Sequence, residues 1–193
     1  GGSAYLVHTE DYNASIVDAV FSLNLLIAII LTVIFYFSAG LIYKFFNLTE
    51  LFPIQLATFT IFFFSLGGVF KGVLQRELSF KKLSLSELIA SLISFFNSIV
   101  ILLFDYGVLA LVSYPLVRGV VELLINMHFT NRRYSLNFDF RVWKKIYNFS
   151  IYLLINNTIN QASRSADQMI IGKQFGDIAV GVYSVAYKIM LFP

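Results

Sequence analysis

The stretch that decides the fold lies near the beginning of the chain: AVFSLNLLIAIILTVIFYFSAGLIY, residues 19–43. These 25 residues between Asp18 and Lys44 carry no charge. Because an α-helix rises about 1.5 Å per residue, such a run is long enough to cross the roughly 30 Å of hydrocarbon in a bilayer. The stretch therefore predicts a membrane-spanning helix.

The rest of the sequence repeats this pattern. A second uncharged run follows the short turn around Asn47, and a third and a fourth span meet at the turn from Asp105 to Gly107. A fifth span and the start of a sixth complete the series. The predicted spans are residues 19–43, 51–70, 83–104, 108–129, 147–171 and 178–193. The predicted fold class is all-α, a polytopic transmembrane helix bundle. The chain begins with glycine and ends inside an apolar stretch, so we expect a fragment.

Composition agrees with this class. Apolar and aromatic residues make up 58% of the chain and charged residues only 13%, against roughly half and a quarter in a soluble domain. A soluble domain of this size could not bury so much apolar surface. The chain has no cysteine, and His8 and His128 lie far apart without partners at ligand spacing. We therefore expect neither a metal site nor a cofactor.

The fifth span is unusually polar. Its polar residues recur at steps of three and four, which places them on one helix face. They are Asn157, Asn160, Gln161, Arg164, Asp167 and Gln168. Arg164 could present a planar fork of donors to a phosphate, with Asp167 holding it in place, while the amides suit sugar hydroxyls. Two alternatives stay open: the stripe joins neighbouring spans, or residues 147–171 form an amphipathic helix on the membrane surface.

The fourth span carries a second charged site. Arg118 and Glu122 are four residues apart, so they share a helix face and can neutralise each other. A charge in hydrocarbon costs at least about 2.5 kcal/mol, and retained charges normally face protein or a water-filled cavity. The pair is therefore either a structural ion pair or part of a cavity lining.

Lysine and arginine residues are distributed unequally between the loops. One side holds nine, in residues 71–82 and 130–145, while the other side holds only Lys44 and Lys173. The positive-inside rule places the richer loops in the cytoplasm and the turns at Asn47, Asp105 and Gly176 outside. Residues 140–147 combine basic and aromatic side chains, which favours a short helix at the membrane surface. The net charge of +3 thus reflects topology, and we expect no binding of nucleic acid.

Two motifs resemble a known family. The first is LQRELSFKKL, residues 74–83, in a predicted cytoplasmic loop. The second is DQMIIG, residues 167–172, continued by FG at 175–176, GVYS at 181–184 and AYK at 186–188. Together they resemble the Wzx-type polysaccharide and lipopolysaccharide exporters, flippases of the multidrug/oligosaccharidyl-lipid/polysaccharide transporter superfamily. Val185 departs from that pattern, since the family often has a basic residue there.

The resemblance implies a fold of two bundles, of six or more helices each, around a cavity that opens alternately to either side. Residues 1–129 would be part of the first bundle, residues 130–146 a basic cytoplasmic linker, and residues 147–193 the start of the second bundle. It also implies flipping of polyprenyl-diphosphate-linked oligosaccharide across the bacterial inner membrane for surface polysaccharides such as O-antigen. Arg164 would meet the diphosphate, with Asp167 beside it.

Several functional alternatives remain at this point. A drug or toxin extruder of the same superfamily would share the fold. A membrane-embedded glycosyltransferase or polymerase would need paired carboxylates in a wet loop, and Glu10 with Asp11 is the only close acidic pair. We expect a transporter and no enzyme. Its expected partners are the lipid bilayer, a lipid-linked oligosaccharide and proteins of polysaccharide assembly.

Overall fold

The structure is a computed structural model that describes residues 2–45 and 50–190. Side chains are not described at positions 163–165, 168, 169, 173, 175, 177, 178, 188 and 189. All regular structure in the described residues is helical, which confirms the predicted all-α class. The helices are α1 (Gly2–His8), α2 (Ala14–Phe45), α3 (Phe52–Arg76), α4 (Phe80–Leu103), α5 (Gly107–Thr130) and α6 (Phe140–Met190). Among them, α2 to α5 are long and apolar enough to cross a membrane.

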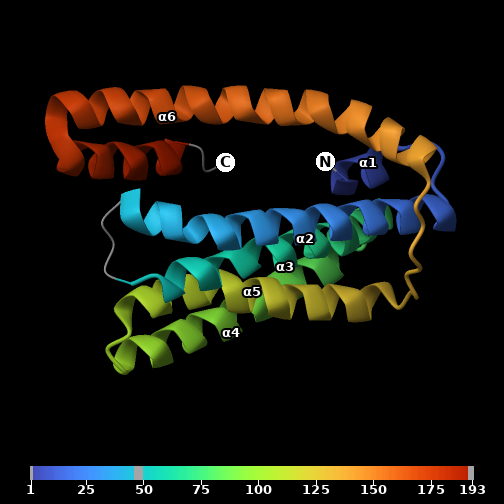
Figure 1. The fold of residues 1–193 in the computed structure, drawn as a ribbon, viewed down its shortest axis with the longest axis horizontal. Helices are drawn as coiled ribbons and strands as arrows, with labels where there is room; N and C mark the ends of the chain where they lie inside the picture. Colours follow the sequence, from blue (N-terminus) through green and yellow to red (C-terminus); the bar gives the residue numbers. More distant parts are fainter. Residues whose placement is uncertain (1, 46–49, 191–193) are drawn as a thin grey trace. The chain divides into compact units, whose positions relative to one another are not determined.

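The chain divides into two compact units, Gly1–Tyr147 and Asn148–Pro193. In the first unit α3 is the central helix, because it contacts α1, α2, α4 and α5. Figure 1 shows α2, α3, α4 and α5 lying side by side. Helices α4 and α5 form a tight hairpin, in which the Ser98 hydroxyl donates to the carbonyl of Ala110 at 2.7 Å.

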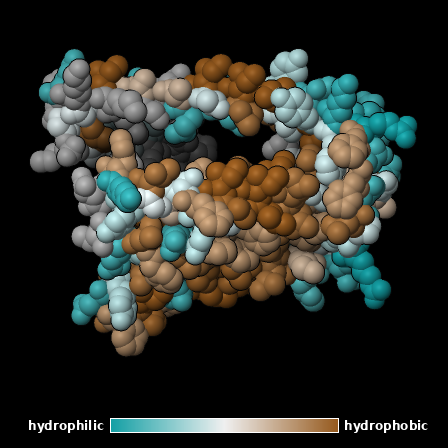
Figure 2. Space-filling model, viewed as in Figure 1, coloured by the Kyte–Doolittle hydropathy of each residue, from teal (hydrophilic) through white to brown (hydrophobic). Residues whose placement is uncertain are grey.

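The packing of the first unit is that of a membrane protein. The buried positions of α4 are mostly small, as at Ser86, Ala90 and Ser94, and small residues let helices approach closely where lipid supplies no hydrophobic force. Large apolar side chains point outward instead, including Ile34 and Phe37 of α2. Figure 2 shows apolar side chains covering much of this unit on the viewed face. Such a surface is suited to lipid.

The third helix is longer than its uncharged run. We expected a span over residues 51–70, whereas α3 continues to Arg76 and places Lys71 inside the helix. The helix continues past the last residue of the uncharged run, and it ends only before Leu78, which adopts a positive φ of 54°. Without Lys71, eight cations remain near the span ends on that side, against two on the other. The predicted orientation is unchanged.

The segment after α5 is fastened to the beginning of α2. Asp18 accepts hydrogen bonds from Arg132 at 3.0 Å and from the Ser135 hydroxyl at 2.7 Å. The indole N–H of Trp143 donates to the carbonyl of Ala19 at 3.0 Å. The basic, aromatic start of α6 therefore belongs to the first unit and is held against α2.

The second unit is a helical hairpin. The α6 helix reverses at Gly176, which has φ 79° and ψ 177° and so needs the freedom of glycine. Close packing follows the turn, because a Cβ atom at Gly172 would lie 3.1 Å from Val180 Cγ2. The turn expected at Gly176 is thus present. That residues 147–171 span the membrane stays a prediction, since α6 is not among the helices that meet the apolar criterion within the described residues.

Candidate functional site

Three helices of the first unit each bring one charged side chain to a common point. Lys71 of α3 lies with its Nζ atom 3.0 Å from the Oε1 atom of Glu87 of α4. The same ammonium group forms an ion pair with Glu122 of α5. Glu122 is only 3% exposed, whereas Glu87 is 48% exposed. Lys71 is therefore the main counter-charge of a buried carboxylate.

Arg118 adds a second cation. It stands eleven residues after Gly107 and twelve before Thr130, so it lies near the middle of α5, about 18 Å from either end. Its Nε atom is 3.9 Å from Glu122 Oε2, within ion-pair range but too far for a hydrogen bond. That Nε–H is buried without a hydrogen-bond partner among the described residues. Arg118 thus keeps one unused donor, its Nε–H, near the middle of α5.

The polar face of α5 continues towards the predicted cytoplasmic end. Asn126 follows Glu122 by four residues and is fully buried. Neither the amide nitrogen nor the amide oxygen of Asn126 finds a hydrogen-bond partner within the described part of the chain. Arg118, Glu122 and Asn126 therefore form a stripe about 12 Å long on one helix face.

The charges in this network balance, with two cations against two carboxylates. Lys71 contacts both carboxylates, so the Arg118 guanidinium is the less engaged cation. A guanidinium presents donors in a planar fork that matches carboxylate or phosphate oxygens. Within the described residues no group of three His, Cys, Asp or Glu side chains could hold a metal ion. The chemistry that the arrangement offers is anion recognition.

Sequence reasoning found only part of this network. It paired Arg118 with Glu122, and it missed Lys71, Glu87 and Asn126. Lys71 was assigned to a loop because the uncharged run stops there. In the structure Lys71, Glu87 and Glu122 lie five, seven and eight residues from the same end of their respective helices, but the predicted end of the second span at residue 70 conceals this match.

The polar stripe predicted on residues 147–171 lies in the second unit. The side chains of Asn157, Asn160 and Gln161 are exposed there. Asp167 is exposed as well and accepts a 3.4 Å hydrogen bond from the Tyr183 hydroxyl across the hairpin. The Arg164 side chain lies outside the described residues, so its pairing with Asp167 stays a prediction.

The fold and the network define a class, a multi-pass helical membrane protein that keeps charged groups buried between its spans. The chain belongs to the polysaccharide biosynthesis protein family, whose model matches residues 1–193. The family resemblance seen in the sequence is thereby confirmed.

Two curated bacterial proteins are similar to this chain. The teichuronic acid biosynthesis protein TuaB of Bacillus subtilis (strain 168) is 24% identical over 196 residues, which cover 100% of this chain and 41% of TuaB. The amylovoran biosynthesis protein AmsL of Erwinia amylovora is 24% identical over 200 residues, covering 99% of this chain and 50% of AmsL. The chain thus spans half or less of the length of these relatives. No solved structure matches the chain.

Proposed function

We propose that this chain is part of a transporter that flips a polyprenyl-diphosphate-linked oligosaccharide across the bacterial cytoplasmic membrane for surface polysaccharide synthesis. The observation that carries the proposal is Arg118, a cation at mid-membrane depth whose Nε–H has no hydrogen-bond partner in the described chain. A diphosphate crossing the membrane must meet cations at such a depth.

Moving the charge of a diphosphate across the membrane is costly in free energy. A diphosphate cannot enter hydrocarbon unaided, because even one buried charge costs at least about 2.5 kcal/mol. In this network Lys71 already neutralises Glu122, so Arg118 can exchange its weak contact with Glu122 for phosphate oxygens. Binding of the diphosphate then leaves the buried carboxylate, Glu122, still paired with Lys71, while Glu87 is 48% exposed.

The glycan needs partners of another kind. Asn157, Asn160 and Gln161 carry amides that can both donate to and accept from sugar hydroxyls. Their three- and four-residue spacing puts them on one face of α6. We assign them to the glycan and Arg164 to the diphosphate. The proposed transport breaks no covalent bond, so under this proposal the protein is not an enzyme.

The relatives favour an oligosaccharide over a drug as the substrate. Both are named for the biosynthesis of a polysaccharide, teichuronic acid in one case and amylovoran in the other. A drug extruder of the same superfamily would carry no polysaccharide phenotype. The amount of surface polysaccharide therefore distinguishes the two candidate functions.

The test uses the full-length protein in a strain that lacks its own copy. We expect Arg118→Ala to reduce surface polysaccharide at least tenfold at unchanged protein level, because a lost charged hydrogen bond costs about 1.5–3 kcal/mol. Arg118→Lys should restore only part of the export, since lysine lacks the planar fork. The matched control is Arg141→Ala, an exposed cation outside the network.

Transport in vesicles separates the proposal from its rival. Vesicles that contain the purified protein should move a fluorescent lipid-diphosphate-linked oligosaccharide to the opposite leaflet, and the Arg118→Ala protein should do so at least tenfold more slowly. Arg164→Ala tests the second predicted contact in the same assay. Normal export by the Arg118→Ala variant, or movement of cationic drugs in place of the oligosaccharide, would contradict the proposal.

A further inference from the structure

A second feature of the first unit is an apolar groove of about 500 Å³ between α2, α3 and α5. Its lining is apolar along most of its length, and the segment after α5 closes one end. The lining residues are Phe21, Leu66, Phe70, Leu123, Met127, Arg132, Arg133 and Tyr134. The Tyr134 ring forms part of the wall, with its centroid 5.2 Å from that of Phe21 and 4.7 Å from that of Phe70. The groove thus has an apolar body and a basic mouth.

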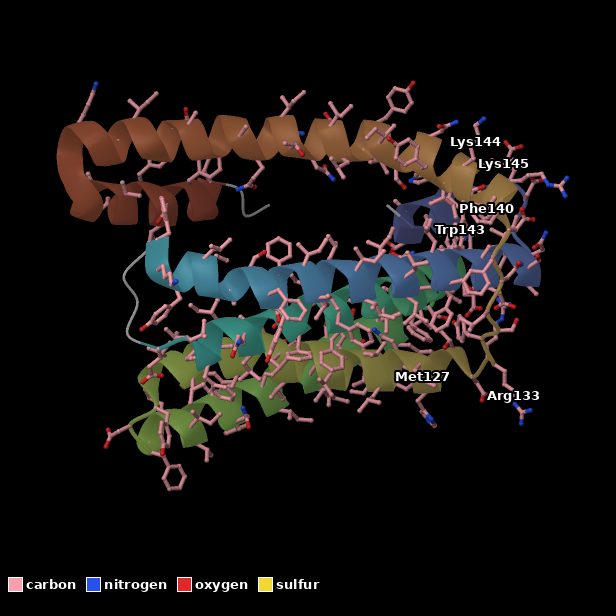
Figure 3. The ribbon with its side chains drawn as sticks, in the orientation of Figure 1. Met127, Arg133, Phe140, Trp143, Lys144 and Lys145 are labelled. Atoms are coloured by element: carbon pink, nitrogen blue, oxygen red, sulfur yellow. The ribbon has the colours of Figure 1, made fainter. Side chains whose placement is uncertain are left out.

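The two arginines at the mouth differ in their partners. Arg132 is occupied, because it donates to Asp18 and to the carbonyl of Ala14 and lies over the Tyr134 ring. Arg133 is exposed and makes no hydrogen bond or ion pair with the described residues. Figure 3 shows Arg133 just beyond the end of α5, pointing away from the helices, and Met127 on the last turns of that helix. Arg133 is therefore available to a ligand.

The charge at the mouth is positive overall. Lys82 is a third cation at this end of α5, with its Nζ atom 3.4 Å from the carbonyl oxygen of Phe129. Two carboxylates lie nearby: Asp18, which Arg132 neutralises, and Glu77, which acts on Tyr134 electrostatically. Burial raises the pKa of Tyr134, so its hydroxyl stays neutral at pH 7. Three cations against two carboxylates leave one positive charge in excess.

The groove is deep enough to hold the headgroup and the first part of the acyl chain of a lipid. The mouth lies after Thr130, where α5 ends, on the side that the lysine and arginine count places in the cytoplasm. Leu123 is seven residues before that end and Leu66 is ten before the end of α3, so the apolar lining reaches about 10–15 Å into the hydrocarbon. An acyl chain would occupy this depth while its phosphate stayed at the interface.

We propose that the groove binds an anionic phospholipid of the cytoplasmic leaflet, with one acyl chain against Leu123 and Met127 and its phosphate on Arg133. Basic pockets between transmembrane helices on the cytoplasmic side are suited to such headgroups. The transported substrate is a less suitable occupant, because its charge must cross the membrane while Arg133 is fixed at the interface. This site is separate from the network around Arg118 and does not depend on the proposed transport.

The test measures lipid retained by the purified full-length protein. The protein is extracted from vesicles of phosphatidylcholine with 20% phosphatidylglycerol, and bound lipid is counted by native mass spectrometry. We expect phosphatidylglycerol to be retained over phosphatidylcholine, and Arg133→Ala to weaken that retention about fivefold, as one lost interfacial cation predicts. Lys144→Ala is the matched control, since Lys144 is an exposed cation that does not line the groove.

A second variant tests the groove itself. Leu123→Trp fills the apolar body and should reduce retention of both lipids, while its melting temperature reports whether the protein still folds. In addition, a photoreactive residue at Met127 should capture phospholipid in the membrane. Equal retention by wild type and Arg133→Ala overturns the proposal. Capture of another part of the same protein, or of lipid-linked oligosaccharide, at Met127 would also overturn it.

Discussion

At the scale of single residues, the ion pair with Lys71 stabilises the buried charge of Glu122. We expect Lys71→Met to destabilise the protein by about 3 kcal/mol, because its removal leaves the buried Glu122 with only the 3.9 Å contact to Arg118. Glu122 is almost inaccessible to water, so solvent cannot replace the lost ammonium group. The melting temperature of the full-length protein in detergent is the measurement.

Two further variants separate charge from packing. Adding Glu122→Gln to Lys71→Met removes the orphaned charge, and the double variant should recover much of the lost stability. Glu87→Gln should lower the free energy of unfolding by at most about 1 kcal/mol, because Glu87 is half exposed and its pair with Lys71 is screened by solvent. If Lys71→Met and Glu87→Gln melt at the same temperature, Glu122 does not depend on Lys71.

At the scale of helices, the sequence predicted the existence and type of the spans but not their full length. Charge-free runs identify α2 and α3, and long apolar runs with one and two charges identify α4 and α5, because a segment in hydrocarbon must be largely apolar and must satisfy its backbone internally. They place the end of α3 at residue 70, six residues short of Arg76, since a helix continues where polar side chains find partners. Lys71 has two such partners, one on α4 and one on α5, and no local sequence pattern reveals those contacts.

The candidate site divides in the same way. Arg118 and Glu122 could be paired from sequence because four-residue spacing on one helix fixes their neighbourhood. Glu87 and Asn126 could not be assigned, because their role depends on how α3, α4 and α5 pack. The sequence also did not predict the groove mouth at Arg133. An arginine in a loop after a helix indicates only the orientation of the span, not a binding site. Periodicity predicts neighbours on one helix, whereas neighbours on different helices are known only from the packed structure.

One helix contact is testable through glycine. At Gly72 of α3 a Cβ atom would lie 2.9 Å from the backbone Cα of Ser3 in α1, so the two helices touch there. We expect Gly72→Ala to destabilise the protein by about 1–3 kcal/mol through overpacking. Gly68→Ala is the matched control on the same helix, because nothing lies within 4 Å of its added Cβ.

The control should be neutral or stabilising by up to about 1 kcal/mol, the advantage of alanine over glycine inside a helix. Thermal unfolding of both variants in the same detergent gives the comparison. Equal melting of the two alanine variants would show that α1 does not pack against α3 at Gly72.

At the scale of the whole molecule, orientation decides what each part of the first unit can meet. The charge network and the groove both lie nearer the end of the spans that carries Lys81, Lys82 and Arg133. Eight cations near the span ends on that side, against two on the other, predict that this end lies in the cytoplasm. With that orientation, the mouth proposed to bind a phosphate would face the leaflet whose anionic lipids attract basic groups, and Arg118 would lie between that side and the outside.

Single cysteines test this orientation directly. We expect a cysteine at Tyr106 to react with an impermeant maleimide added to intact cells, and a cysteine at Leu136 to react only after the membrane is opened. Both positions are well exposed, and the 193 residues contain no cysteine of their own. The two sites lie at opposite ends of α5, so one labelling experiment reports both faces of the same span. The reverse pattern would place the Arg133 mouth in the outer leaflet. It would then remove the argument that the groove faces cytoplasmic anionic lipid, while leaving the network around Glu122 intact.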